Sequence, residues 1–403
     1  MEKLKNLLVF ILLSGILLGL VACVKSEAAR SANTANSNSA DGLALDIGDT
    51  TKASEKRKSQ KQDKSDSKEQ KSEKQAEGEN MENLYIDKIG TPGKAEIYLA
   101  AGCFWGTEAY FKRVQGILET EVGYANGKSK ETSYRELSDT GHAETLKITY
   151  NPHKIHLAEI LERFYRIIDP YSINKQGNDY GTQYRSGIYF TDKALQDLIN
   201  YSVKNFEEIA GKKTAIEVAE LKNYVSAEDY HQDYLDKNPG GYCHINTEEA
   251  DAPLFPGEDL PSEEKLKEIL EGLAYKVARE SATEMPHSSA LDQEFSEGIY
   301  VDVATGEPLF SSADKFDAGC GWPSFTMPIT TDVLAYYGDD SYGMQRIEVK
   351  ARSTNHLGHV FEDGPKANGS LRYCINGIVL RFIPLENMDE AGYAALKPFV
   401  FKK

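Results

Sequence analysis

The pattern of apolar and polar residues predicts a mixed α/β region over residues 95–247. Apolar side chains recur at helical spacing over 156–168, and a second helix is predicted over 192–210. A third helix is predicted over 108–114, and a Ser-x-x-Asp capping box at 226–229 indicates where a last helix begins. Short apolar or alternating runs predict strands at 95–100, 145–150, 187–190 and 214–221.

The pattern changes beyond residue 263. One short helix is predicted over 264–272, and glycine, proline and aspartate turns then separate short apolar runs. These runs predict strands at 298–303, 307–310, 345–351, 359–362 and 378–383. We therefore expect an α+β protein, in which a mixed α/β domain is followed by a mainly antiparallel β domain.

The N-terminus has the pattern of a secretion signal over residues 1–22. Lys3 and Lys5 supply positive charge, and the apolar run that follows is too short for a comfortable membrane span. The segment Leu20–Cys23 is similar to a bacterial lipobox, in which the cysteine thiol is lipidated. An uncleaved signal anchor is the alternative. Both interpretations predict an extracytoplasmic protein attached to the cell membrane, as a lipoprotein through Cys23 in the first case.

A disordered tether is predicted over 23–84. Its Ser, Ala and Asn residues are followed by a Lys/Glu/Gln/Ser/Asp tract that cannot bury enough apolar surface to fold. A cluster of Pro, Glu and Asp predicts a linker over 248–262, which separates domains at 85–247 and 263–403. The net charge of −17 and the mixed charge of the tether argue against a nucleic-acid partner.

Cysteine is sparse in this chain. Besides Cys23 there are four, one pair in each domain, whereas a disulfide scaffold would be far denser in cysteine. Isolated pairs favour redox catalysis by a nucleophile and a resolving thiol. Buried apolar cysteines are the structural alternative. The pairs are Cys103 with Cys243 and Cys320 with Cys374.

Cys103 lies between a glycine and two aromatic residues, Phe104 and Trp105. It follows a predicted strand and comes shortly before a predicted helix, where the helix dipole and free N–H groups lower a thiol pKa. The two rings supply an apolar wall, which suits a substrate with a methyl or thioether group. The sequence thus predicts a reactive thiolate beside an apolar surface.

Four motifs follow one another in this region: G-C-F-W, G-H-A-E, Q-G-N-D-x-G-x-Q-Y-R-S and G-Y-C-H-I. In this order they resemble the peptide methionine sulfoxide reductase A family, over most of residues 95–247. The resemblance implies a ferredoxin-like α/β core and reduction of the S-epimer of methionine sulfoxide. It also implies roles for the matching residues: nucleophile Cys103, methyl-binding Phe104 and Trp105, the acid Glu144, hydrogen-bonding Tyr134 and Tyr184, substrate-orienting Asp179 and resolving Cys243.

The implied chemistry explains why an acid is needed. A sulfoxide is a poor electrophile until its oxygen is protonated, so the Glu144 carboxyl must be neutral near pH 7, and burial in an apolar site achieves this. Attack leaves a sulfenic acid on Cys103, and Cys243 condenses with it to a disulfide. Some members have a second cysteine where this chain has Gly106, so one resolving route remains. The structural alternative is that Glu144 is an exposed strand residue and the two tyrosines are ordinary half-buried ones.

The second domain has its own motifs: P-L-F, K-F-D-A-G-C-G-W-P-S-F, H-L-G-H-V-F followed by D-G-P, and R-Y-C-I-N. They resemble methionine sulfoxide reductase B over about residues 275–385, which implies reduction of the R-epimer. The resemblance again implies roles: nucleophile Cys374, resolving Cys320, sulfoxide-handling His356, His359 and Asn376, and Trp322 as the platform for the substrate methyl.

Two histidines three residues apart invite a metal interpretation, which we do not favour. Structural zinc needs four N or S ligands, and some family members have two C-x-x-C pairs for it. This chain has Asp302 and Thr305 in that region instead, so we expect no zinc and no other cofactor. The ordinary pKa of histidine suits a general acid beside a thiolate.

Together these patterns predict a bifunctional oxidoreductase that repairs oxidised methionine in surface proteins. Its electrons would come from an extracytoplasmic thioredoxin-like dithiol, because the sequence has no C-x-x-C or flavin motif of its own. A thiol peroxidase and a non-catalytic surface adhesin are the alternative functions.

Overall fold

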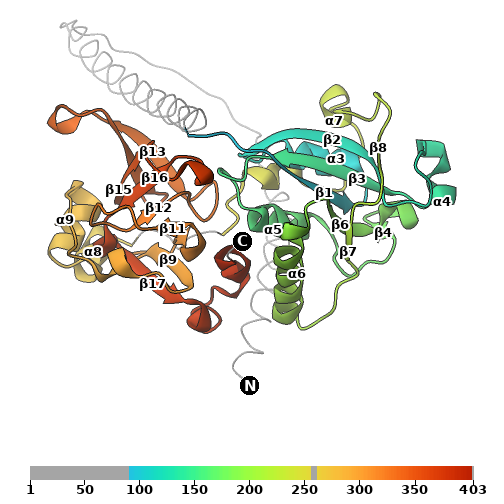
Figure 1. Ribbon diagram of the computed structural model, residues 1–403. Coiled ribbons are helices and arrows are strands. Elements are labelled where there is room, and N and C mark those ends of the chain that lie inside the picture. Colours follow the sequence, from blue (N-terminus) through green and yellow to red (C-terminus); the bar gives the residue numbers. More distant parts are fainter. Residues whose placement is uncertain (1–89, 256–260, 402–403) are drawn as a thin grey trace, which may run out of the picture. The chain divides into compact units, whose positions relative to one another are not determined.

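The computed structural model describes residues 90–255 and 261–401 (Figure 1). The predicted signal, the lipobox with Cys23 and the tether lie outside these residues. Within the described part of the chain, none of the helices has the length and apolar character needed to cross a membrane.

The first domain is built on a six-stranded sheet with the order β7-β6-β1-β3-β2-β8. All neighbouring strands are antiparallel except the parallel pair β6 and β7. The strands are β1 Ala95–Ala101, β2 Ile117–Ala125, β3 Ala143–Tyr150, β6 Ser186–Phe190, β7 Glu217–Glu220 and β8 Tyr224–Ser226.

The helices of this domain complete a ferredoxin-like core. Along the chain the central elements run β1-α3-β2-β3-α5-β6, and their strands lie in the order β6-β1-β3-β2. The predicted core is therefore confirmed. The helices are α3 Phe104–Phe111, α4 Leu137–Thr140, α5 Leu157–Ile167, α6 Gln196–Ala210 and α7 Tyr234–Lys237, and a two-stranded hairpin consists of β4 Lys175–Gln176 and β5 Asp179–Tyr180.

Two local predictions in this domain are wrong. The helix expected over 108–114 begins four residues earlier, at Phe104, directly after Cys103. The capping box does not start a helix: Ser226 ends strand β8, where it pairs with Gly123 of β2, and the next helix begins only at Tyr234. Ser226 therefore takes part in strand pairing and does not cap a helix, because tertiary contacts that are not visible in the local sequence override its local preference.

The second domain is mainly antiparallel, as predicted, and its strands form two sheets. Their orders are β10-β9-β17 and β11-β12-β16-β15-β14-β13. The strands are β9 Gly298–Asp302, β10 Pro308–Ser311, β11 Lys315–Phe316, β12 Ser324–Phe325, β13 Leu334–Asp339, β14 Arg346–Ala351, β15 His356–Phe361, β16 Arg372–Ile375 and β17 Leu380–Pro384. The single helix expected over 264–272 is two, α8 Glu263–Ile269 and α9 Leu273–Glu280, because Gly272 between them has a positive φ.

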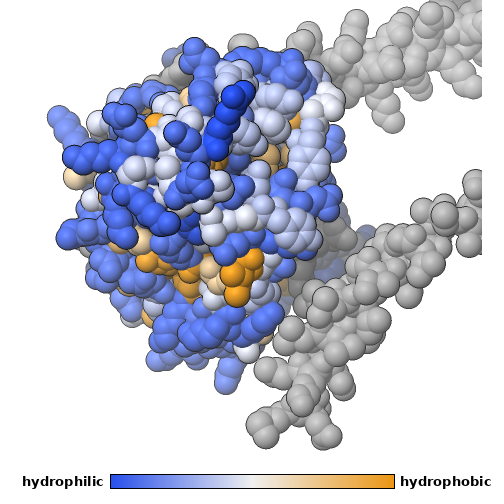
Figure 2. Space-filling view, turned by 90° about the vertical axis from the view of Figure 1, so that its right-hand side faces the viewer, coloured by the Kyte–Doolittle hydropathy of each residue, from blue (hydrophilic) through white to orange (hydrophobic). Residues whose placement is uncertain are grey.

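Each domain buries most of its large apolar side chains. Phe104, Phe111 and Phe164 lie in the core of the first domain, and Phe310 stacks on Phe325 in the core of the second, with ring centroids 4.4 Å apart. The face of the molecule seen in Figure 2 is mostly hydrophilic, with one group of apolar side chains. The apolar side chains of both domains are thus mainly used for packing in the two cores.

Candidate active sites

Cys103 is the N-terminal cap of helix α3, at the end of strand β1. Gly102 before it has a φ of +81°, and a side chain there would place its Cβ 2.4 Å from the Cβ of Gln176. Both the backbone conformation and the space therefore require glycine. This sharp strand-to-helix turn presents the thiol at the start of the helix.

The environment of Cys103 does not lower its pKa as the helix position suggested. Burial, and then the Glu144 carboxylate, raise the pKa of the Cys103 thiol to about 12, although backbone N–H groups of Trp105 and Gly106 act in the opposite direction. Only 7% of the residue is exposed. Loss of solvation outweighs the helix terminus here, so the resting residue is a thiol.

Glu144 lies on β3 and is almost completely buried, at 2% exposure. Its carboxylate accepts the backbone N–H of Phe104 at 3.2 Å, which joins it to the first turn of α3. Burial raises the pKa of Glu144 to about 8, with a further contribution from Asp179. The carboxyl is therefore mainly protonated at pH 7, and the alternative of an exposed strand residue is wrong.

The other polar residues expected at this site gather around Glu144. Tyr134 and Tyr184 share a hydrogen bond, and burial followed by the Glu144 carboxylate raises the pKa of both hydroxyls. Asp179, on β5, acts on the same groups and on Cys103. The structure thus places three hydroxyl or carboxyl groups around one buried acid.

His231 was not found by sequence reasoning, although it supports the aromatic wall. Trp105 donates its indole N–H to Nδ1 of His231 at 3.1 Å and stacks on Tyr234, with ring centroids 3.7 Å apart. The Phe104 ring lies 5.2 Å from the His231 ring. The accepted hydrogen bond fixes the neutral tautomer, and burial lowers the pKa of His231. The aromatic segment around His231 was the only signal for it in the sequence.

Cys243 lies on the irregular segment after α7 and is half-buried. Its thiol donates to the backbone carbonyl of Ile245 at 3.1 Å. Burial raises the pKa of the Cys243 thiol. This cysteine also belongs to the partly buried side chains that pack against the core of the first domain.

In the second domain the two thiols are already close. The sulfurs of Cys320 and Cys374 are 3.8 Å apart, and Cys374 on β16 is the register partner of Ser324 on β12. Burial raises the pKa of Cys374 to about 12. Cys320 is less buried, and hydrogen bonds, the first from Ser324, outweigh its burial and lower its pKa. Cys320 is therefore the more acidic thiol of the pair.

A β-bulge brings the two histidines together. His359 is the register partner of Cys374, and the pairing of β14 with β15 shifts so that Leu357 is an extra residue. Residues three apart on a regular strand point to opposite faces, but a bulge reverses the alternation. The His356 and His359 rings consequently lie 5.6 Å apart.

Each histidine is held by a carboxylate that sequence reasoning missed. Nδ1 of His356 lies 2.6 Å from Glu348, and Nε2 of His359 lies 2.8 Å from Asp339. Although burial acts against ionisation, the hydrogen bond to His356 holds the pKa of Glu348 down to about 2. Nε2 of His356 is buried and has no hydrogen-bond partner among the described residues. This ring atom is therefore open to a further hydrogen bond.

Asn376 and Trp322 are both anchored by Glu284. The Asn376 amide accepts the N–H of Glu284 at 2.9 Å and donates to the carbonyl of the bulged Leu357 at 2.9 Å. The indole of Trp322 donates to the Glu284 carbonyl oxygen at 3.2 Å. The structure therefore uses one of the two amide N–H groups of Asn376 to hold the bulge.

The segment around Asp302 does not fit a structural zinc ion. The Asp302 carboxylate accepts hydrogen bonds from the backbone of Ala304 and Thr305 and from the side chains of Ser353 and Asn355. These donors use its oxygens, and the set contains no thiol or imidazole. Within residues 90–255 and 261–401, no cluster of His, Cys, Asp and Glu is suited to a metal ion.

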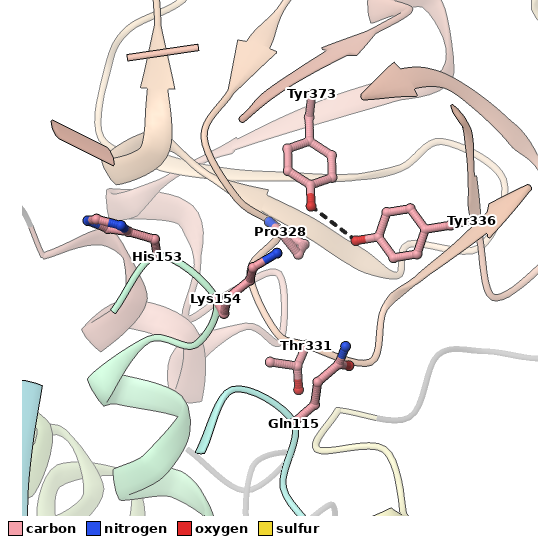
Figure 3. A pocket seen from close by; sticks show the side chains of 7 residues that line it. All are labelled: Gln115, His153, Lys154, Pro328, Thr331, Tyr336 and Tyr373. Carbon is pink, nitrogen blue, oxygen red and sulfur yellow. Dashed lines mark hydrogen bonds between the residues drawn. The ribbon is translucent and has the colours of Figure 1, made fainter. Parts of the chain in front are cut away.

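Figure 3 shows a small cavity that contains neither thiol pair. Its volume is about 20 Å³, roughly enough for one water molecule. The hydroxyls of Tyr336 and Tyr373 meet at 3.1 Å on its wall. It is too small for a methionine side chain. The lining residues are Gln115, His153, Lys154, Pro328, Thr331, Tyr336 and Tyr373.

Two family models match this chain, one in each domain. A family model for peptide methionine sulfoxide reductase matches residues 95–256, and a model for the SelR domain matches residues 270–384. The structure of Mxr1 from Saccharomyces cerevisiae in reduced form shares 41% sequence identity with this chain. The match covers 38% of this chain and 90% of the Mxr1 chain, with a TM-score of 0.37. Methionine sulfoxide reductase A of Corynebacterium diphtheriae is 33% identical, with 38% and 80% covered and a TM-score of 0.35. Mxr1 in complex with Trx2 is 27% identical, with 36% and 90% covered and a TM-score of 0.27.

The family matches cover the two regions in which the thiol pairs lie. They agree with the motif order of the sequence and with the separate α/β and β domains. The protein is an oxidoreductase that reduces methionine sulfoxide. The chain belongs to the methionine sulfoxide reductases and is a fusion of an A-type and a B-type domain.

Proposed function

We propose that the first domain reduces the S-epimer and the second the R-epimer of methionine sulfoxide in oxidised proteins. The observation that carries this proposal is the difference between the two proton donors. A buried carboxylic acid, Glu144, lies beside the Cys103 helix turn, whereas a carboxylate-held histidine, His356, lies near Cys374. Two chemically different sites in one chain suit two substrates of opposite handedness.

In the first domain, the protonated Glu144 donates to the sulfoxide oxygen while the Cys103 sulfur attacks the sulfoxide sulfur. The S–O bond of the substrate breaks, methionine leaves, and Cys103 becomes a sulfenic acid with that oxygen. The thiol proton of Cys103 returns to Glu144. Cys243 then attacks the sulfenic sulfur and releases water, which leaves a disulfide.

In the second domain, Cys374 is the nucleophile and Cys320 the resolving thiol. The lower pKa of Cys320 and the 3.8 Å between the sulfurs suit attack by the Cys320 thiolate on a sulfenic acid of Cys374. The proton that Cys374 loses in the first attack passes to the imidazole of His356. The free Nε2 of His356 is the group that protonates the sulfoxide oxygen, and Glu348 stabilises the imidazolium form. Cys320 afterwards closes the disulfide.

A thiol peroxidase is the weaker candidate. Peroxide reduction depends on a thiolate in the resting enzyme, and the pKa of Cys103 is raised to about 12 by burial. A non-catalytic adhesin is also disfavoured, because a buried acid beside a buried thiol is costly to keep without a function.

The electron donor in this proposal is a thioredoxin-like dithiol. The solved complex of Mxr1 with Trx2 supports it by analogy. We also propose that the second domain needs no zinc, because hydrogen bonds already use the Asp302 carboxylate. Elemental analysis of purified protein tests this, and one zinc per chain would contradict it.

We further propose that Cys23 is lipidated and attaches the enzyme to the outer face of the cell membrane. Support comes from the signal-like run and the lipobox. Mass spectrometry of the membrane-bound form tests it, and an intact Met1 without an acyl group would reject it. Cys23→Ala should release the protein.

Separate assays with the two epimers test the division of labour. Cys103→Ser should abolish reduction of the S-epimer and leave R-epimer turnover unchanged, and Cys374→Ser should do the reverse. If either variant loses both activities while it remains folded, the two sites are not independent. Consumption of peroxide in place of sulfoxide would favour the peroxidase.

A further inference from the structure

Gly106 lies in the first turn of α3, where its backbone conformation does not require glycine. The residue is buried and has ordinary right-handed helical geometry, and glycine lowers helix stability relative to alanine. The lack of room for a side chain at position 106 explains the glycine instead. A Cβ at this position would lie 2.7 Å from the sulfur of Cys243 and 3.2 Å from Cδ1 of Ile245. A separation of 2.7 Å between this Cβ and the Cys243 sulfur is shorter than the van der Waals contact distance of the two atoms.

Both sulfurs of the first domain contact this one residue. The backbone N–H of Gly106 is directed at the sulfur of Cys103 and lowers its pKa, against the larger effect of burial. The sulfur of Cys243 occupies the place of the missing side chain, and its hydrogen bond to the Ile245 carbonyl, 3.1 Å long, holds it there. Gly106 is thus the common neighbour of the two thiols.

We propose that Gly106 is a positioning residue for disulfide formation: its missing side chain keeps the resolving thiol of Cys243 beside Cys103. This inference rests on the roles of Cys103 and Cys243 in the proposed function. In the step concerned, the Cys243 sulfur attacks the sulfenic sulfur of Cys103, the S–O bond breaks, and the oxygen leaves as water. A side chain at 106 would turn the Cys243 sulfur away and break its hydrogen bond.

Gly106→Ala tests the proposal, and Gly240→Ala is the matched control. Gly240 precedes Cys243 on the same segment, but a Cβ there has no atom within 4 Å. Reduced enzyme receives one equivalent of S-epimer, and we measure released methionine, dimedone labelling of Cys103 and the Cys103–Cys243 disulfide. Steady-state turnover with thioredoxin is measured separately.

We expect Gly106→Ala to release one methionine at a rate within about twofold of wild type, because attack by Cys103 does not use Cys243. Dimedone labelling should rise, and thioredoxin-dependent turnover should fall about tenfold or more, since no disulfide forms for thioredoxin to reduce. Dithiothreitol, which attacks a sulfenic acid directly, should restore turnover. Gly240→Ala should match wild type in every assay.

Normal disulfide formation in Gly106→Ala would overturn the proposal. Loss of the first methionine would also overturn it, since Gly106 would then serve Cys103 or the fold. The Cys243→Ala background separates a folding defect from the proposed contact: Gly106→Ala should lower Tm less there than in wild type, and an equal loss contradicts the contact. If wild type itself releases no methionine, the proposed function fails, and not only this inference.

Discussion

The two domains hold their thiol pairs in different ways. In the second domain, Cys374 lies within a strand, and its register partner Ser324 bonds to Cys320, so the sulfurs are 3.8 Å apart before any reaction. In the first domain, Cys103 caps a helix, whereas Cys243 lies on an irregular segment and its thiol donates a hydrogen bond to a backbone carbonyl. The sheet thus brings its two sulfurs into direct contact, whereas the first domain brings each of its two sulfurs to a common neighbour, Gly106.

The two groups that we propose as proton donors, Glu144 and His356, also differ in what controls their protonation. Glu144 is neutral because burial raises its pKa to about 8, and it needs no charged partner. His356 depends on Glu348, whose carboxylate accepts from its ring. Desolvation prepares one donor and an ion pair the other.

The largest effect is expected from Glu144→Gln. The amide keeps the size of the side chain but cannot donate the acidic proton, so kcat/KM for the S-epimer should fall by about 10²–10⁴-fold. R-epimer turnover should not change. Glu131→Gln, at an exposed position of the same domain, is the control. Equal loss of both activities would refute separate acids.

Cys320→Ser and Cys243→Ser should block recycling in one domain each. Neither serine can form a disulfide, so each nucleophile should stall as a sulfenic acid after one turnover, and thioredoxin-dependent turnover should fall about 10²-fold.

In wild type, dimedone should trap Cys103 more than Cys374, because the second pair is already in contact. Preferential trapping of Cys374 would reverse the comparison.

Glu348→Gln should weaken the histidine of the second domain. Without the carboxylate, the imidazolium form of His356 is less stable, and we expect kcat/KM for the R-epimer to fall about tenfold or more, as with other carboxylates that orient a histidine. The alkaline limb of the pH profile, along which a general acid loses its proton, should move to lower pH. Glu390→Gln, at an exposed position, is the control. An unchanged pH profile would exclude this role for Glu348.

A smaller effect concerns the reactivity of Cys103 without substrate. Above pH 8 the ionised Glu144 raises the thiol pKa further, and below pH 8 its protonated form does not. Iodoacetamide should therefore alkylate Cys103 a few-fold faster in Glu144→Gln than in wild type at pH 9, with a smaller difference at pH 7. The rates follow from mass spectrometry of the Cys103 peptide. An equal ratio at both pH values would contradict the coupling. Because burial raises the pKa of Cys103, slow alkylation of this residue at neutral pH would not mean that it is catalytically inactive.

Periodicity predicted most of the framework, including α5, α6, β1 and β3. It did not predict β2, whose first half mixes apolar and charged residues and is only partly buried, or β16, which has only four residues. Both owe their place to neighbouring strands, and their own sequence does not require it.

The motifs pointed to the residues that we propose to react at both sites, but not to the groups that hold them. His231 and Glu284 act through contacts between segments that are far apart in the sequence. The contact of Glu348 with His356 and the bulge at Leu357 both depend on the pairing of β14 with β15. The expected low pKa of Cys103 was wrong for a related reason. The helix terminus is visible in sequence, whereas the burial that outweighs it is a property of the fold.

The burial of Cys103 has a consequence for survival. Peroxides attack thiolates far faster than thiols, and a thiol with a pKa of about 12 and 7% exposure is almost never ionised at neutral pH. The resting site is therefore expected to resist the same oxidants that create its substrate. Under oxidative attack the first domain would keep its nucleophile, because the Cys103 thiol becomes a target only when it reacts.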